Sequence, residues 1–271
     1  MRGGAGRIQR LYDRLSERDL AILYDLDRVR LLTGNHLRRL HFPEGNPVTQ
    51  GRKARAALQR LGDLGVIVRL ARRVGGIRAG SEGLVVGLSG WGHAVLDVGH
   101  QPARRHRRVP ETKPAFEAHT LAITELYVQL FERHRTGRAE LLEFRGEPAS
   151  WRRFGGMGGE TVTLKPDAYT RLGVGEYELA AFIEQDMATE SLTTIASKLG
   201  VYVRYWQSGL EQRARGFFPL VWWLVPTAAR AEAIGRVIRA LPAEAQALFA
   251  VSLSAEAADV LTSPPPSGGG A

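Results

Sequence analysis

Two short apolar runs that each carry acids constrain this chain more than any other feature of its sequence. The first run covers residues 162–172 and contains Asp167 directly after a proline, and the second covers residues 177–186 and ends with Glu184 and Asp186. Residues two apart on a strand project from the same face, so Glu184 and Asp186 would point the same way. If the two strands are neighbours, the three carboxylates converge, and such a cluster of oxygen ligands suits Mg²⁺ or Mn²⁺.

The same pattern has a simpler interpretation. Two strands joined by a short turn form a hairpin, and acids at its ends would be solvated and without a chemical role. Three carboxylates close together repel one another unless a cation, a proton or a basic group compensates them. That electrostatic cost favours a metal site, and the solvated hairpin remains the alternative.

Charge is distributed unevenly along the chain. Residues 1–110 contain 21 Lys and Arg against 9 Asp and Glu, a net charge of +12, whereas residues 111–271 contain 16 against 19, a net charge of −3. A basic first part is typical of proteins that meet a polyanion such as double-stranded DNA. A general preference for Arg over Lys explains the residue type, but it does not explain the asymmetry between the two parts.

The composition excludes several classes of protein. The chain has no Cys, so it has no disulfide, no thiol nucleophile and no zinc site with Cys ligands. It contains no run of about 18 apolar residues that would cross a membrane. Its N-terminus lacks the apolar core of a signal peptide. We therefore expect a cytoplasmic protein that associates with the nucleoid or with a plasmid.

The first part of the chain predicts three short helices followed by a hairpin. Ser16 and Thr33 have the residue type and position of N-caps for the first two helices. The third helix, about residues 48–63, has its apolar positions at helical spacing on one face. Two apolar runs, 66–70 and 84–88, flank a basic loop and predict the hairpin. This order of elements is that of a winged helix-turn-helix, whose third helix enters the major groove of DNA.

The candidate DNA-binding residues lie on the third helix and on the basic tip of the hairpin. Cationic side chains there would neutralise phosphates, and Gln or Arg side chains would reach base edges. These candidates are Gln50, Arg52, Lys53, Arg55 and Gln59 on the helix and Arg72, Arg73 and Arg78 on the hairpin. The alternative is a winged helix that contacts another protein.

The predicted domain organisation has four parts. A winged-helix domain occupies residues 1–98, and a basic linker bracketed by prolines occupies residues 99–115. A second domain occupies residues 116–258, and a disordered tail, rich in Pro, Gly and Ser, occupies residues 259–271. The elements of the second domain run helix, three strands, helix, strand, helix, strand, so the chain as a whole is of the α+β or α/β class.

This order of elements in the second domain resembles the restriction-endonuclease-like core, which has a mixed sheet and a motif written PD-(D/E)xK. Pro166 and Asp167 match the first two positions, and Glu184 matches the third. The motif Lys is replaced by Asp186, and Lys198 on the following helix would take its place. The resemblance implies four catalytic residues, which are Asp167, Glu184, Asp186 and Lys198. Asp167 and Glu184 would hold Mg²⁺ or Mn²⁺, and Asp186 or Glu147 would complete the metal site.

The chain also resembles, more specifically, the replication-relaxation family of bacterial plasmid and mobile-element proteins. The resemblance covers roughly residues 15–225 and rests on the basic winged helix and on short motifs in a set order. These motifs are His119–Thr120–Leu121–Ala122, Lys165–Pro166–Asp167–Ala168, Phe182–Ile183–Glu184–Gln185–Asp186, Thr189–Glu190–Ser191, and Lys198–Leu199 with Tyr202 and Tyr205. An acid at position 186 agrees with the family pattern. The family is associated with plasmid replication and DNA relaxation.

Two functions follow from these expectations. The first is a metal-dependent enzyme that nicks or cleaves DNA by phosphodiester hydrolysis, with the cation as Lewis acid and water activator. The second is a DNA-binding regulator of transcription or replication whose nuclease-like domain is inactive and serves dimerisation or partner binding. The missing motif Lys and the net charge of the second part favour the regulator, whereas the cost of clustered acids favours the enzyme. Winged-helix proteins often dimerise, so we expect a homodimer.

Overall fold

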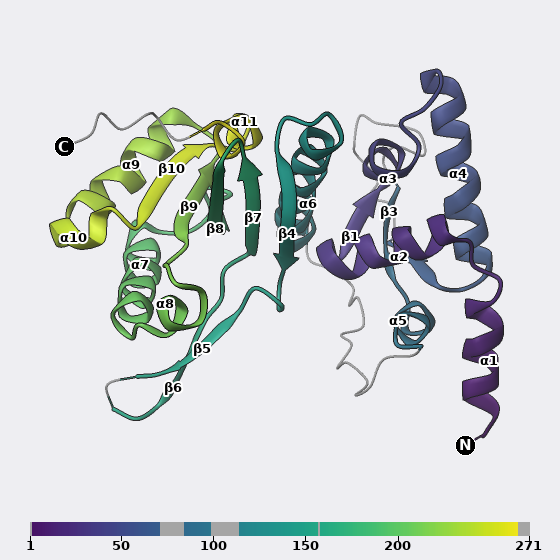
Figure 1. Ribbon diagram of the computed structural model, residues 1–271, viewed down its shortest axis with the longest axis horizontal. Coiled ribbons are helices and arrows are strands. Elements are labelled where there is room, and N and C mark those ends of the chain that lie inside the picture. The colour runs from purple at the N-terminus through teal and green to yellow at the C-terminus, as the bar shows by residue number, and fades with distance from the viewer. Residues whose placement is uncertain (1, 71–83, 99–113, 157, 265–271) are drawn as a thin grey trace. The chain divides into compact units, whose positions relative to one another are not determined.

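The chain folds into a mixed α+β structure, as the sequence predicted (Figure 1). The computed structural model describes residues 2–70, 84–98, 114–156 and 158–264. These residues divide into two compact units, an N-terminal unit that ends at Val128 and a C-terminal unit that begins at Gln129. Within the described ranges, no helix combines the length and the apolar character that crossing a bilayer requires.

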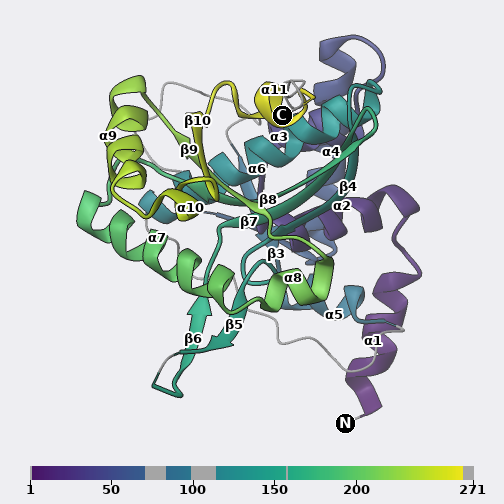
Figure 2. The same cartoon turned by 60° about the vertical axis from the view of Figure 1, so that its left-hand side comes forward.

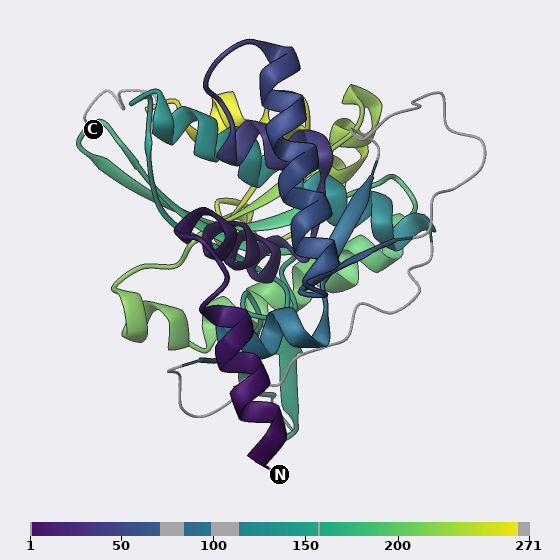
Figure 3. The same cartoon turned by 90° about the vertical axis from the view of Figure 1, so that its right-hand side faces the viewer.

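The N-terminal unit combines helices with a small antiparallel sheet (Figure 3). Its complete helices are α1 (Arg2–Tyr12), α2 (Glu17–Val29), α3 (Gly34–His41), α4 (Pro47–Asp63) and α5 (Gly90–Leu96), and its strands are β1 (Leu31–Thr33), β2 (Ile67–Arg69) and β3 (Val85–Leu88). The strands lie in the order β1-β3-β2, and both pairings are antiparallel. The three predicted helices are α2, α3 and α4, and β2 and β3 occupy the positions of the predicted hairpin.

Local hydrogen bonds explain where two of these helices begin. The Ser16 hydroxyl accepts the backbone N–H of Asp19, and the Asp19 carboxylate accepts the backbone N–H of Ser16, which closes a capping box at the start of α2. The Thr33 hydroxyl accepts the backbone N–H of His36 at the start of α3. Both N-caps were predicted from the sequence and are confirmed.

The face of α4 that the sequence predicted to be apolar is buried. Its members are Ala54, Ala57, Leu58 and Leu61, none of them more than 5% exposed. Burial of such side chains contributes about 25 cal/mol for each Å² of apolar surface removed from water. The opposite face of α4 carries exposed polar and charged side chains.

Helix α6 (Pro114–Arg135) is continuous across the division between the two units. Its residues up to Val128 belong to the N-terminal unit. The Tyr127 hydroxyl donates to the Asp25 carboxylate of α2 at 2.6 Å, and both side chains are buried. This bond helps to fasten the first part of α6 to the N-terminal unit.

The division of the units differs from the predicted domain boundaries. The predicted second domain starts at residue 116, which lies within α6 and before the division. The predicted linker, residues 99–115, lies outside the described residues apart from its last two. The tail predicted to be disordered, residues 259–271, is helical at its start, because α11 (Ala257–Leu261) extends into it and buries Leu261.

The C-terminal unit is built on a five-stranded mixed sheet (Figure 2). In sheet order the strands are β10 (Phe249–Leu253), β9 (Leu220–Val225), β8 (Tyr177–Gln185), β7 (Ala168–Val174) and β4 (Glu140–Gly146). The pairings of β4 with β7 and of β7 with β8 are antiparallel, and those of β8 with β9 and of β9 with β10 are parallel. A separate hairpin pairs β5 (Arg152–Gly155) with β6 (Thr161–Leu164).

One hydrophobic core joins this sheet to the helices that pack on it. Helices α7 (Leu192–Gln207) and α9 (Ala228–Arg239) contribute buried side chains to the same core as β8 and β9. The rings of Phe182 and Tyr202 lie 5.9 Å apart, an aromatic contact that adds to the burial of apolar area. The short helices α8 (Leu210–Arg215) and α10 (Ala243–Gln246) complete the unit.

The predicted strand over residues 162–172 is two strands in the structure, β6 and β7. The break surrounds Pro166, which has no N–H and cannot donate within a ladder. The backbone N–H of Asp167 then donates to the carbonyl oxygen of Ile183, and the pairing of β7 with β8 follows from there. The second predicted strand is confirmed as β8, which ends at Gln185.

Candidate functional site

Strands β7 and β8 bring two of the predicted acids to one end of the sheet. Ala168 pairs with Ile183 in the antiparallel ladder. Continuing this register by one residue places Asp167 opposite Glu184. The Asp167 carboxylate accepts the backbone N–H of Gln185 at 2.8 Å, which holds it at the end of β8. The two acids therefore lie side by side on neighbouring segments.

Glu184 is buried on the face of the sheet that α7 covers. Its side chain is 3% exposed, and its neighbour in register on β9 is Trp223. The Tyr202 hydroxyl donates to Glu184 Oε1 at 2.6 Å, and the Lys198 ammonium lies 3.4 Å from Oε2. Burial, with the charge of Asp167 adding to it, raises the pKa of Glu184 to about 8. A carboxyl group that titrates near neutral pH is suited to accept or donate a proton.

Lys198 places a positive charge next to these acids. Its ammonium lies 3.4 Å from Glu184 Oε2 and 3.0 Å from Glu190 Oε2. Burial opposes its charge, but Glu184, Glu190 and Asp167 together raise the pKa of Lys198 above its usual value. Lys198 and Tyr202 reach the same carboxylate because residues four apart share one face of a helix.

Asp186 does not join this group. Both of its carboxylate oxygens accept from the Arg230 guanidinium of α9, at 2.7 and 2.9 Å, and one of them also accepts the backbone N–H of Ala188. Its side chain is 1% exposed. Within the described part of the chain, no three His, Asp or Glu side chains are grouped so that they could hold a metal ion. The predicted convergence of three acids therefore holds for two, because an internal ion pair occupies the third.

Sequence reasoning missed the partner of Asp186 and had a signal for one partner of Glu184. Arg230 follows Asp186 by 44 residues, and no spacing rule connects the two. Tyr202 follows Lys198 by four residues within a predicted helix, so a shared face was readable from the sequence. The nuclease resemblance implied that Lys198 would join Asp167 and Glu184, but nothing in the sequence indicated that Tyr202 would bond to Glu184.

The outward face of α4 carries the other predicted site. Arg52, Lys53 and Arg55 are exposed, and none of them has a carboxylate partner in the described part of the chain. The helix itself contains no acid before Asp63. The potential over this face is therefore positive. The three arginines predicted on the hairpin tip lie outside the described residues: Arg72, Arg73 and Arg78.

The two glutamines predicted to reach base edges are engaged inside the N-terminal unit. Gln50 donates to two backbone carbonyl oxygens of the preceding turn and accepts from Arg38 at 2.9 Å. Gln59 donates to Asp63 and accepts from Arg69. Contact with a base would require these bonds to break, which makes the cations the stronger candidates on α4.

Comparison with known proteins bears on the chain as a whole. No curated protein and no solved structure matches it. A family model described as Replication-relaxation matches residues 23–221. This match spans most of the chain and includes both α4 and the end of β8. The protein therefore belongs to the replication-relaxation family.

Proposed function

We propose that the protein binds double-stranded DNA through the outward face of α4, in the replication or relaxation of a plasmid or another mobile element. The observation that carries the proposal is a set of exposed cations on that face that have no carboxylate partner among the described residues: Arg52, Lys53 and Arg55. The order of helices and strands in the N-terminal unit is typical of a winged helix, which supports the proposal. In such an arrangement α4 enters the major groove and its cations contact the flanking phosphates.

The double substitution Arg52→Ala with Arg55→Ala tests this proposal. It removes two exposed charges without touching the buried face of α4. In fluorescence anisotropy, all duplexes should bind more weakly. The slope of log K against log salt should fall by about 2 units, since each phosphate contact contributes close to one.

A second pair of arginines provides the matched control. Arg236→Ala with Arg239→Ala on α9 removes the same charge from side chains that are 63% and 59% exposed. This control should bind DNA as the wild type does. Unchanged binding by the α4 variant, or an equal loss in both variants, would refute binding through α4.

A second function, hydrolysis of a DNA strand with a divalent cation, is favoured by the contact of Lys198 with Glu184. Asp167 and Glu184 fit such a cation as oxygen ligands, because Mg²⁺ is usually held by one or two carboxylates together with water and phosphate. Asp186 does not fit, because Arg230 occupies both of its oxygens. When bound, Mg²⁺ or Mn²⁺ would activate water and stabilise the charge that develops on the phosphate.

The side chains of the site have separable roles in this second proposal. Asp167 and Glu184 hold the cation, which requires Glu184 to release its proton. Tyr202 orients the Glu184 carboxylate through the hydrogen bond to Oε1. Lys198 keeps its proton and polarises the water or the scissile phosphate.

Supercoiled plasmid incubated with the protein and Mg²⁺, Mn²⁺ or EDTA tests hydrolysis directly. Metal-dependent conversion to nicked or linear DNA is expected. Asp167→Asn and Glu184→Gln should lose it, and the exposed variant Glu232→Gln should keep it. Plasmid that is retarded but uncut under every condition would instead favour a regulator whose C-terminal unit serves dimerisation or partner binding.

Light scattering in solution tests the homodimer that we expect.

A further inference from the structure

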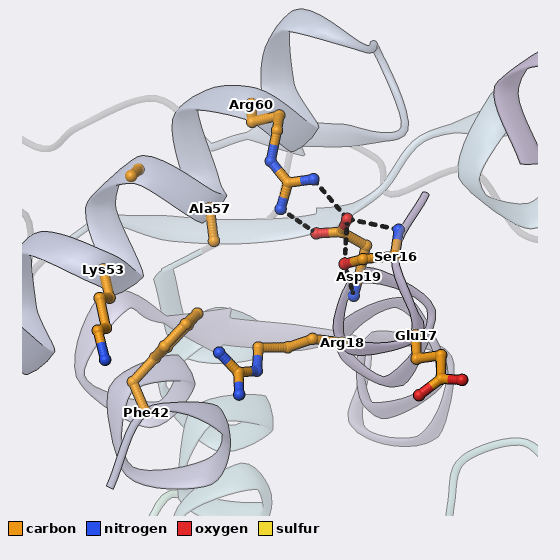
Figure 4. A pocket seen from close by; sticks show the side chains of 9 residues that line it. Ser16, Glu17, Arg18, Asp19, Phe42, Lys53, Ala57 and Arg60 are labelled. Carbon is orange, nitrogen blue, oxygen red and sulfur yellow. Dashed lines mark hydrogen bonds and ion pairs between the residues drawn. The ribbon is translucent and has the colours of Figure 1, made fainter. Parts of the chain in front are cut away.

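A groove of about 790 Å³ lies between the start of α2 and one side of α4 in the N-terminal unit (Figure 4). Its α4 wall contains Lys53, Ala56, Ala57 and Arg60, and its α2 wall contains Arg18 and Asp19. The residues of the α4 wall follow one another at helical spacing, so they share one side of the helix. This side borders the exposed cations that we assign to DNA binding.

Two cations of the groove are not neutralised by any carboxylate that the structure describes. The Arg18 guanidinium lies 5.1 Å from the centroid of the Phe42 ring, a contact that orients it. Neither Arg18 nor Lys53 has a carboxylate partner in the described part of the chain. Figure 4 shows both charged groups next to Phe42 and the carboxylate of Glu17 turned away from them. The groove therefore presents two available positive charges from two different helices.

Arg60 and Asp19 form a fixed pair at the other end of the groove. Two hydrogen bonds of 2.5 Å join the Arg60 guanidinium to the Asp19 carboxylate, which is fully buried. Burial opposes the charge of Asp19, but the bonds from Arg60 and Ser16 lower the pKa of this carboxyl below its usual value. Its negative charge is compensated within the pair and does not neutralise Arg18 or Lys53.

We propose that this groove binds one phosphodiester group of the DNA strand that runs along α4, with Arg18 and Lys53 as its ligands. The inference rests on the proposed DNA binding and adds a contact from α2. Ala56 is exposed, and its small side chain leaves room for a phosphate to approach the helix. The groove continues the line of cations on α4, and a nucleic-acid backbone presents regularly repeated negative charges along such a line.

Ala56→Glu and Ala56→Gln form the sharpest test. Both place a side chain of similar size at an exposed position of α4, and both new residues favour helices, but only Glu adds a negative charge beside the two cations. With a labelled duplex at low salt, Ala56→Glu should bind about tenfold more weakly than Ala56→Gln. This difference in affinity should become smaller as the salt concentration rises. Because a phosphate contact does not depend on the base sequence, the difference in affinity between the two variants should be equal for unrelated duplexes.

Arg18→Gln tests the contribution of α2 by itself. The salt slope of DNA binding should fall by about 1 unit, since one phosphate contact is lost. If the wild type binds DNA but Ala56→Glu equals Ala56→Gln and Arg18→Gln keeps the full slope, the groove is not a phosphate site for DNA. If the wild type binds no duplex at all, the proposed function itself fails.

Inorganic phosphate and ATP serve as probes for a free ligand of the same chemistry. Thermal stabilisation by either probe that Arg18→Gln removes, without any effect of Arg18→Gln on DNA binding, would assign the groove to a free phosphate compound. That result would overturn the proposed DNA contact. Competition between the probes and the duplex, weakened in Arg18→Gln, would support it.

Discussion

Asp186 and Glu184, two buried carboxylates at the end of β8, differ in how their negative charges are compensated. Asp186 shares both oxygens with the Arg230 guanidinium and accepts a backbone N–H from Ala188. Glu184 accepts one hydrogen bond from the Tyr202 hydroxyl, and the Lys198 ammonium lies 3.4 Å from its other oxygen. Burial raises the pKa of Glu184 to about 8. Both acids are buried, so burial by itself does not explain their different roles. The number and geometry of their hydrogen-bonding partners explain the difference.

The difference separates a structural acid from a reactive one. A two-point guanidinium contact compensates the whole carboxylate and fixes its orientation. The compensation of Glu184 is incomplete, and incomplete compensation is the condition under which a proton or a cation binds. We therefore expect Asp186 to control stability and Glu184 to control the response to pH and to divalent cations.

Asp186→Asn should have the largest effect. The free energy of unfolding should fall by about 3 kcal/mol, because Arg230, only 14% exposed, would lose its opposite charge. Urea unfolding at pH 7 measures the change. Glu232→Gln removes an exposed partner of Arg239 on the same helix and should cost less than about 1 kcal/mol. An equally small loss in both variants would break the contrast between the two acids.

Per pH unit, the change in stability that Glu184 causes should come next in size. The folded protein holds the proton of Glu184 up to about pH 8, whereas the ordinary pKa of the group is 4.5. Between these values the unfolded state binds fewer protons than the folded state, so stability must fall as pH rises. Relative to Glu184→Gln, the free energy of unfolding should fall by about 1.4 kcal/mol per pH unit and stay level above pH 8.

Urea unfolding of both proteins from pH 4.5 to pH 9 measures this fall. The difference between the two curves isolates Glu184 from the other titrating groups. Parallel curves would mean that the pKa of Glu184 is not raised, and the distinction from Asp186 would lose its basis.

Tyr202→Phe should sharpen the comparison with a smaller effect. It removes the hydroxyl that donates to Glu184 Oε1 and should cost about 1 kcal/mol of stability. Because that bond favours the charged carboxylate, the pKa of Glu184 should rise further, and the fall in stability should extend above pH 8. Tyr205→Phe on the same helix is the control, since that hydroxyl donates to Glu211 and should leave the pH range unchanged.

Stabilisation by Mg²⁺ should be the smallest effect. At a Mg²⁺ concentration equal to Kd, binding adds about 0.4 kcal/mol to the free energy of unfolding. The gain should be larger at pH 8.5 than at pH 6.5, because the cation binds ionised Glu184. Thermal unfolding followed by fluorescence measures it, and Asp167→Asn should abolish it. Equal shifts at both pH values, or a shift kept in Asp167→Asn, would place the cation elsewhere.

Much of the fold was readable from the sequence because its signals act over a few residues. Ser16 and Thr33 bond to backbone groups three residues away, so they marked the starts of α2 and α3. Pro166 was recognised as a residue of strand ends, yet one strand was predicted where the structure has β6 and β7. The meeting of Asp167 with Glu184 was predictable, since consecutive antiparallel strands bring the start of one beside the end of the other.

The partners of the acids depended on the tertiary structure. Arg230 reaches Asp186 from a helix 44 residues further along the chain, and no local pattern selects that arginine from the others. The sequence predicted that Gln50 would contact a base edge from the outward face of α4. In the structure its side chain instead bonds to the preceding turn and to Arg38.

The positions of the carboxylates at the strand ends could thus be predicted from the sequence, because backbone hydrogen bonding and side-chain alternation act over a few residues. Charge state is different, since it depends on burial and on groups brought from distant segments. The packing of α7 and α9 on the sheet supplied Lys198 and Tyr202 to one acid and Arg230 to the other. That packing is why two acids with the same sequence signal have different chemistry.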